Sequence, residues 1–213
     1  MRKLVFASAL FVSAIVVSSF IARPSHADSS VSPDPVHNFA GKWTLDKGHS
    51  NVKFTVTHMV VSEVEGAFKT FDGTIESTKP DFSDAVINFT VDVTSVNTDN
   101  ENRDKHLKSD DFFNSEKFPQ MKFQSTSFKP VGGNKYKLDG NLTIRDVTKP
   151  VSFDVTYGGS INTQRGAKIG FKANTTINRF DYNLKWDRAT EAGGLVVAKD
   201  VVVSINGQFN EVK

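Results

Sequence analysis

The 213-residue chain contains no cysteine, which excludes disulfide bonds, thiolate metal sites and cysteine catalysis. It has only 3 tyrosines and 2 tryptophans against 18 phenylalanines, so most of its aromatic surface has no polar group. It also lacks a Gly-rich phosphate loop and a Gly-x-Ser-x-Gly elbow, the motifs typical of nucleotide-binding proteins and of α/β-hydrolases. The phenylalanines predict either a Phe-rich core or an apolar cavity lined with rings.

A long apolar run occurs only at the N-terminus. Met1-Arg2-Lys3 precedes an apolar stretch from Leu4 to about Ile21, and Ser25-His26-Ala27 suits cleavage before Asp28. This order is typical of a secretory signal peptide, predicted over residues 1–27; an uncleaved membrane anchor is the alternative. No later stretch is long and apolar enough to span a bilayer, so no membrane span is expected in the mature chain.

The charge of the chain changes once this segment is removed. Residues 1–27 hold three basic side chains and no acidic one, which leaves 23 Lys and Arg against 24 Asp and Glu. The basic isoelectric point of the precursor therefore gives no reason to expect a nucleic-acid partner. Residues 28–40 are rich in Ser, Pro and Asp and predict a flexible leader, and residues 41–213 are predicted to form one domain.

Most of that domain alternates between apolar and polar residues, as β-strands with one buried face do. Gly66 and Gly73 interrupt one such run and predict a bulge or a bend. About eight strands separated by short turns predict an all-β, eight-stranded antiparallel up-and-down barrel, with a β-sandwich as the alternative. The main predicted strands cover 51–60, 64–77, 85–93, 121–129, 136–145, 151–157, 169–177 and 199–212.

The stretch Ser95–Met121 does not alternate and is predicted to be a helical insertion between strands. Thr98 and Glu101 have the spacing of a capping box, which predicts a short helix from about Asp99 to Lys108. The helix has little apolar surface of its own and must be held by its neighbours. Phenylalanines follow it closely, so the insertion is interpreted as a polar helix joined to an aromatic plug.

A few polar residues could carry chemistry. His58 ends an apolar strand face and is either a core histidine, a ligand contact or a metal ligand. Metal binding is disfavoured because no His-x-His or His-x₃-His spacing occurs. Arg103 could form a structural ion pair with Asp104 or bind the polar head of a ligand. Ser50 follows His49 directly, which gives no support for a nucleophile–base pair, so no catalytic and no metal-binding residue is predicted.

Five motifs in order resemble the YceI-like family, and the resemblance as a whole extends from Trp43 to Phe209. Asn183 stands where that family usually has a glycine. The motifs are Asp46-x-x-His49-Ser50-x-Val52-x-Phe54-x-Val56-x-His58; Gly66-x-Phe68-x-x-Phe71-x-Gly73; Ser95-Val96-x-Thr98-x-Asn100-x-x-Arg103-Asp104-x-His106-Leu107 with Asp111-Phe112-Phe113; Phe118-Pro119-x-Met121-x-Phe123-x-Ser125-Thr126; and Gly140-x-Leu142-Thr143-Ile144-x-x-Val147-Thr148-Lys149-Pro150-Val151.

This resemblance implies a lipocalin-like barrel exported to the periplasm, with an apolar tunnel for a polyisoprenoid, quinone-like or other long-chain amphiphilic lipid, and often a homodimer. No other cofactor is expected. Two alternatives are an accessory or stress-response protein that acts through a protein partner, and an enzyme acting on a lipid. Arg103, His106, His58 and Arg179 are the candidates for the lipid head group. The candidates for the tail are Phe54, Phe68, Phe71, Phe89, Phe112, Phe113, Phe123, Phe153, Phe171 and Trp186.

Overall fold

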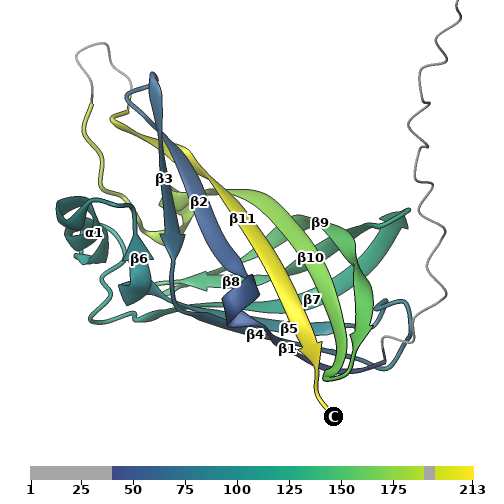
Figure 1. Ribbon diagram of the computed structural model, residues 1–213. Coiled ribbons are helices and arrows are strands. Elements are labelled where there is room, and N and C mark those ends of the chain that lie inside the picture. Colours follow the sequence, from purple (N-terminus) through teal and green to yellow (C-terminus); the bar gives the residue numbers. More distant parts are fainter. Residues whose placement is uncertain (1–39, 190–194) are drawn as a thin grey trace, which may run out of the picture. The chain divides into compact units, whose positions relative to one another are not determined.

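The computed structural model describes residues 40–189 and 195–213, which form one antiparallel sheet and one α-helix (Figure 1). The predicted signal peptide and nearly all of the predicted leader lie outside these residues. The strands are β1 (Gly41–Leu45), β2 (Asn51–His58), β3 (Ser62–Phe68), β4 (Phe71–Ser77), β5 (Val86–Asp92), β6 (Val96–Asn97), β7 (Gln120–Gly132), β8 (Lys135–Ile144), β9 (Val147–Thr163), β10 (Gly166–Asn178) and β11 (Val197–Glu211).

The sheet closes on itself. The strands β1, β4, β5, β7, β8, β9, β10 and β11 are hydrogen-bonded in that order, and β11 pairs back with β1. β2 and β3 are separated from β1 and β4 by short breaks; β2 pairs with β11, and β3 pairs with β2. The prediction of an eight-stranded antiparallel barrel is therefore confirmed, and closure leaves few free strand edges.

The break between β1 and β2 is a single 3-10 turn, η1 (Lys47–His49). Asp46 caps it by accepting a hydrogen bond from the Gly48 amide, 3.1 Å away. The same carboxylate accepts a bond from Gln208 Nε2 at 3.0 Å and contacts His49 Nδ1 at 3.1 Å. The hydrogen bond from His49 is the main reason that the pKa of Asp46 falls to about 2. The turn is thereby fastened to β11.

The predicted alternation holds on the strand faces that point inward. Val52, Phe54 and Val56 of β2 face the barrel interior, whereas Lys53 between them is exposed. The same pattern repeats on β11, where the register pairs Val203 with Phe54. The interior of the barrel is consequently formed by one face of every long strand, as alternation requires.

Gly66 and Gly73 do not mark a bulge, because the pairings of β3 with β2 and of β4 with β5 are regular at both positions. The bend predicted in this run occurs instead at Lys69 and Thr70, between β3 and β4. The two glycines have another function. Each lies directly across from a phenylalanine, Phe54 or Phe89, on the neighbouring strand.

The predicted helix is present, but the predicted capping box is wrong. α1 runs over Glu101–Lys108, and its N-cap is Asn100, whose side chain accepts a bond from the Arg103 amide at 2.9 Å. Asp99 has a φ of 58°, a left-handed conformation that cannot start an α-helix, so the first turn begins two residues later than predicted. Thr98 instead bonds through its hydroxyl to Asp104.

α1 buries none of its residues and is held mainly by polar contacts. Arg103 donates from Nε to Thr98 Oγ1 (2.8 Å) and from Nη2 to the Thr98 carbonyl (2.7 Å). Leu107 packs against the barrel core, as expected for the only large aliphatic side chain of the helix. Within residues 40–189 and 195–213, no helix has the length and apolar character to cross a membrane.

Candidate functional site

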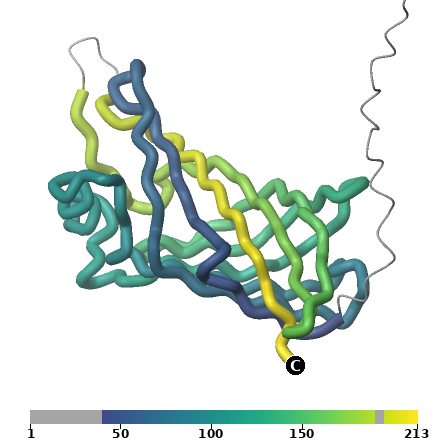
Figure 2. The backbone as a smooth tube through the Cα atoms, in the orientation of Figure 1, coloured from purple at the N-terminus to yellow at the C-terminus, as the bar shows by residue number. Residues whose placement is uncertain are grey.

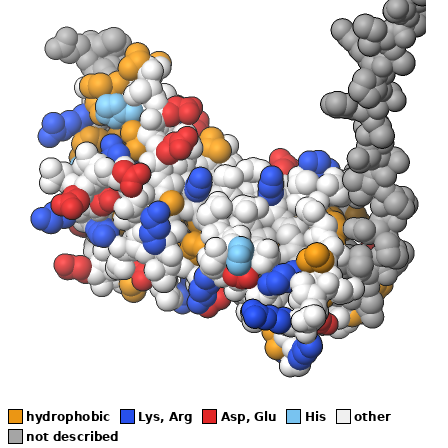
Figure 3. Space-filling model, viewed as in Figure 1, with side chains coloured by type: hydrophobic (Ala, Val, Ile, Leu, Met, Phe, Trp, Pro, Cys, Tyr) orange, Lys and Arg blue, Asp and Glu red, His pale blue; other side chains and the backbone are white. Residues whose placement is uncertain are grey.

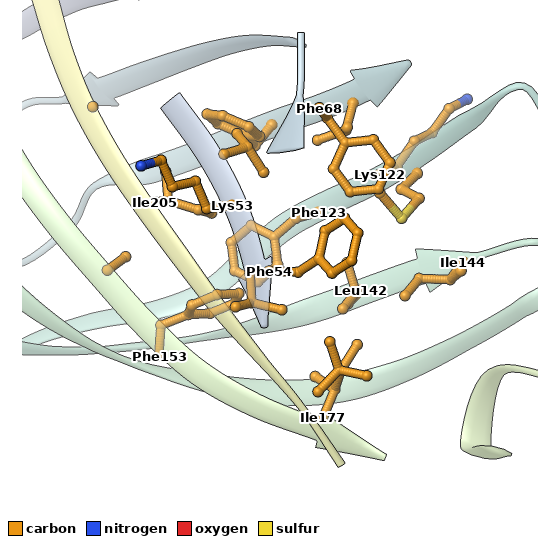
Figure 4. Close-up of a pocket in the computed structure, with 18 of the residues that line it drawn as sticks. Lys53, Phe54, Phe68, Lys122, Phe123, Leu142, Ile144, Phe153, Ile177 and Ile205 are labelled. Atoms are coloured by element: carbon orange, nitrogen blue, oxygen red, sulfur yellow. The ribbon is translucent and has the colours of Figure 1, made fainter. Parts of the chain in front are cut away.

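The barrel encloses a cavity of about 220 Å³ whose wall is almost entirely apolar (Figure 4). Nine of the fourteen residues predicted to contact a ligand belong to this wall: Phe54, Phe68, Phe89, Phe112, Phe113, Phe123, Phe153, Phe171 and Arg179. The remaining five lie outside it: His58, Phe71, Arg103, His106 and Trp186. The cavity therefore gathers most of the predicted aromatic residues and leaves out most of the predicted polar ones.

Aliphatic side chains make up the rest of the wall, and the search for aromatic residues missed them. The signal was present in the sequence, because these residues sit on the same alternating faces as the phenylalanines. They include Val52, Val56, Ile75, Ile87, Val91, Leu138, Leu142, Ile144, Val155, Ile177, Val201, Val203 and Ile205.

The cavity is long and narrow. On β11 alone, wall residues extend from Val197 to Phe209, which is roughly 40 Å along a strand at about 3.3 Å per residue. Its volume is below the range of about 300–1,000 Å³ that is usual for pockets that hold compact small molecules. A slender, linear molecule fits this shape better than a bulky ring system.

Glycines in the barrel wall leave room for the aromatic rings that line the cavity. A Cβ atom at Gly66 would lie 2.3 Å from Phe54 Cζ, and one at Gly73 would lie 2.6 Å from Phe89 Cδ2. Both distances are far below normal contact, so only glycine allows these rings to lie flat over the neighbouring strand. The rings thereby line the cavity without filling it.

This arrangement predicts the effect of Gly73→Ala. The new methyl group must push the Phe89 ring into the cavity, so affinity for a ligand there should fall about tenfold, with a loss of about 1 kcal/mol in the free energy of unfolding. Gly140→Ala should cost more stability, about 2–3 kcal/mol, because its Cβ would meet the backbone oxygen of Gln124 at 2.5 Å.

Gly170→Ala is the matched control, because no atom lies within 4 Å of its added Cβ. Denaturant unfolding and ligand titration of the three variants would check the prediction. Equal affinities for Gly73→Ala and Gly170→Ala would show that the Phe89 ring has room to move elsewhere.

One end of the cavity is covered by α1 and by the segment that follows it. Leu107, Phe112 and Phe113 contribute to the wall, and the Phe113 ring meets the Phe68 ring edge-on at 5.9 Å. The prediction of an aromatic plug after a polar helix agrees with this arrangement.

Arg145 fastens this covering segment to the barrel, a function that the sequence did not reveal. Its Nη1 atom donates to the carbonyls of Asp110 (3.0 Å), Phe112 (2.8 Å) and Asn183 (3.2 Å). Asn183 has a φ of 61°, the left-handed conformation for which glycine and asparagine are the common choices. Asparagine therefore suits this position, where the resemblance of the sequence led us to expect a glycine.

Arg179 is the one basic residue buried at the cavity wall, with 3% of its surface exposed. It belongs to the 3-10 turn η3 (Arg179–Tyr182), and burial lowers the pKa of its guanidinium, an effect opposed by Asp187. Its nitrogens donate to four backbone carbonyls at 2.6–2.9 Å, those of Leu184, Trp186, Val197 and Ala198. These bonds join the chain after η3 to the start of β11. Arg179 therefore stabilises the contact between these two segments.

The other predicted head-group residues surround the covered end without lining it. His106 Nε2 lies 2.8 Å from Asp111 Oδ2, and its ring meets the rings of Phe112 and Trp186 edge-on at 5.1 and 5.2 Å. His58 is the last residue of β2 and pairs with Val197. Both histidines are thus neighbours of a wall residue, His106 of Phe112 and His58 of Val197.

Polar chemistry is sparse in the cavity itself. Lys53 and Lys122 contribute to the wall but are exposed residues, and Figure 4 shows their nitrogen atoms pointing away from the surrounding rings. In the part of the chain that the structure describes, no group of three or more His, Cys, Asp or Glu side chains could hold a metal ion. The arrangement is suited to burying an apolar chain.

A family model and a curated relative both match most of this chain. A model of the YceI-like domain matches residues 43–209. The UPF0312 protein SA2479 of Staphylococcus aureus strain N315 is 36% identical over 170 residues, which cover 79% of this chain and 96% of the relative.

Solved structures show the same barrel. BcnA of Burkholderia cenocepacia has a TM-score of 0.65 at 26% identity, covering 77% of this chain and 98% of its own. The YCEI protein of Campylobacter jejuni has a TM-score of 0.62 at 31% identity, covering 74% and 90%. A polyisoprenoid binding domain from Saccharophagus degradans has a TM-score of 0.60, covering 80% and 98%; at 16% identity this likeness shows the fold alone.

Proposed function

The chain belongs to the YceI-like family, and we propose that its barrel binds the tail of a long-chain amphiphile, a polyisoprenoid or a similar lipid, and carries it in the periplasm. The observation that supports this function is the cavity, which is long, narrow and almost free of polar atoms. Carriage in the periplasm depends on the predicted signal peptide at residues 1–27.

The tail would supply most of the affinity. A tail that buries about 300 Å² of apolar surface gains about 7 kcal/mol at ~25 cal/mol per Å², before the costs of ordering are subtracted. Taken alone, a gain of about 7 kcal/mol would correspond to a dissociation constant of about 10 μM; the ordering costs weaken this value, so release of the lipid should not be slow. No polar group in the cavity has to be satisfied by the tail.

The head group would stay at the covered end, outside the narrow cavity. His106 is the strongest candidate to contact it, because the ring is partly exposed and touches Phe112 of the wall. Arg179 and Arg103 are less suited, since their guanidinium groups already donate to oxygens of the protein. His58 and Trp186 complete the polar and aromatic surroundings of this end.

The shape of the cavity provides a test. Lipid-free protein should bind a linear prenyl alcohol, geranylgeraniol, and should bind cholesterol at least tenfold more weakly, because the fused rings are too wide for the cavity. Quenching of tryptophan fluorescence and calorimetry would measure both affinities. Equal binding of both compounds would contradict the proposed shape selectivity, and binding of neither would contradict the carrier function itself.

A further inference from the structure

The hairpin that joins β2 to β3 ends in three consecutive exposed hydrophobic residues. Met59, Val60 and Val61 are 49%, 76% and 86% exposed. Among residues 40–189 and 195–213, the other exposed large hydrophobic side chains stand singly in the sequence. Figures 1 and 2 show the hairpin projecting from the end of the barrel that carries α1, and Figure 3 shows hydrophobic side chains gathered there.

The backbone of this turn is unfavourable for the residues that occupy it. The Val61 amide donates to the His58 carbonyl at 3.2 Å, and Met59 and Val60 have φ angles of 51° and 67°. The β-turn His58–Val61, with positive φ at both of its central residues, has the form of a type I′ turn, for which Asn-Gly is strongly preferred. A β-branched residue at positive φ is a rare outlier. Folding alone therefore gives no reason for apolar residues at this turn.

The two stretches of chain that form the turn and lie beside it contain no Asp, Glu, Lys or Arg. These stretches are residues 55–62 and 195–198. These two stretches lie side by side, because the Met59 amide donates to the Val196 carbonyl at 2.8 Å. Beyond them lie exposed charges of both signs: Glu63 and Glu65 of β3, and Arg188, whose carbonyl accepts from the Val196 amide at 2.9 Å. The turn thus presents an apolar, neutral surface with charges of both signs around it.

The turn is also close to the cavity. Val56 and Val197, which belong to the two strands that lead to it, are both wall residues. Val56 precedes Met59 by only three residues, or roughly 10 Å of strand. A surface that contacts the turn would therefore lie next to the end of the cavity where the proposed ligand has its head group.

We propose that Met59, Val60 and Val61 insert into a lipid bilayer and dock this end of the barrel on the membrane that supplies or receives the ligand. This inference rests on the proposed function, because docking on a membrane serves the protein only if the barrel carries a lipid. A stable protein interface needs about 20–30 residues a side, whereas a shallow apolar insertion into the membrane interface needs only a few side chains. Because the surface itself is neutral, and the two acidic residues of β3 stand against the basic residue Arg188 around it, docking should not require anionic lipids.

The test is sedimentation of the exported protein with vesicles of phosphatidylcholine alone. The wild-type protein should sediment with the vesicles. The triple variant Met59→Asn, Val60→Gly and Val61→Thr should bind them at least tenfold more weakly, and it should unfold at a higher temperature because Asn-Gly suits the turn. The matched control is Val131→Thr with Ile161→Thr, which removes two side chains that are 65% and 61% exposed on hairpins at the other end of the barrel.

Membrane docking is wrong if the wild-type protein fails to sediment with the vesicles, or if the triple variant sediments as the wild type does. It is also wrong if the control variant loses binding to the same extent, since the effect would then be general surface hydrophobicity. Binding of geranylgeraniol in solution separates this inference from the proposed function. The triple variant should keep that binding, whereas failure of the carrier function would abolish it in the wild-type protein and leave vesicle sedimentation intact.

Discussion

Val203→Asp should lower the affinity for a bound lipid more than 100-fold, because it places a carboxylate in the wall against an apolar tail that cannot solvate it. Val203 lies midway along β11 and pairs with Phe54 of β2, also a wall residue. Titration with geranylgeraniol would measure the loss. Circular dichroism should still show a β-sheet protein, since water can enter the unliganded cavity and hydrate the carboxylate.

Val202→Asp is the matched control for this variant. It makes the same chemical change one residue earlier, on the outer face of the same strand, where Val202 is exposed. Its affinity for the lipid should stay within about twofold of the wild-type value. If Val203→Asp and Val202→Asp bind lipid equally well, the ligand does not occupy the barrel. If Val203→Asp unfolds the protein, Val203→Thr offers a milder change of nearly the same volume and should still reduce the affinity.

Arg179→Ala should lower the free energy of unfolding by about 3–5 kcal/mol, because it leaves four buried or partly buried carbonyl groups without their donor. Arg179→Lys should restore little of that loss, since one ammonium group cannot reproduce the fork of the guanidinium. Urea denaturation would provide the measurement. Ligand affinity should fall as well, because Leu184 and Val197, whose carbonyls accept from Arg179, belong to the cavity wall.

Arg165→Ala serves as the control, because Arg165 is exposed in the turn between β9 and β10. Its free energy of unfolding should differ from the wild-type value by less than about 0.5 kcal/mol. An Arg179→Ala protein within about 1 kcal/mol of the wild type would mean that water replaces the guanidinium at the four carbonyls, and that Arg179 is available for a ligand after all.

The parts of this fold that follow from local patterns could be predicted from the sequence. Alternation identified the inward face of β2, with Val52, Phe54 and Val56, because the period of a strand is two and one face must be buried. The same rule applied to β11 located Val203 and Ile205. The inward face of each strand was predictable from alternation. Alternation does not tell, however, which of the inward side chains border the cavity and which simply pack against one another.

Features that depend on contacts between distant segments were missed. Arg145 holds Asp110 and Phe112, more than 30 residues away along the chain, and nothing in its local sequence indicates these partners. The capping box failed for a related reason. Thr98 has the right spacing to Glu101, but the positive φ of Asp99 turns the chain and leaves Asn100 to cap the helix.

Polar candidates were the least predictable part of the site. Residue type made Arg103 and Arg179 attractive as head-group contacts, whereas their partners in the structure are a threonine and backbone carbonyls. A guanidinium can donate hydrogen bonds to oxygens of the protein or to a ligand. Only the geometry of the folded chain shows which of these two roles a given arginine has. Phe71 shows the same limit for apolar residues: it stacks behind Phe89 at 6.2 Å and does not line the cavity.

The most direct test of the central claim is native mass spectrometry of protein exported to its own periplasm, followed by solvent extraction. The account predicts one lipid adduct per chain that extracts as a linear, long-chain amphiphile such as a prenyl lipid. The Val203→Asp protein, prepared in parallel, should carry none, and the Val202→Asp protein should carry the wild-type amount. A wild-type protein without any adduct that also fails to take up geranylgeraniol would contradict the claim that the barrel is a lipid carrier.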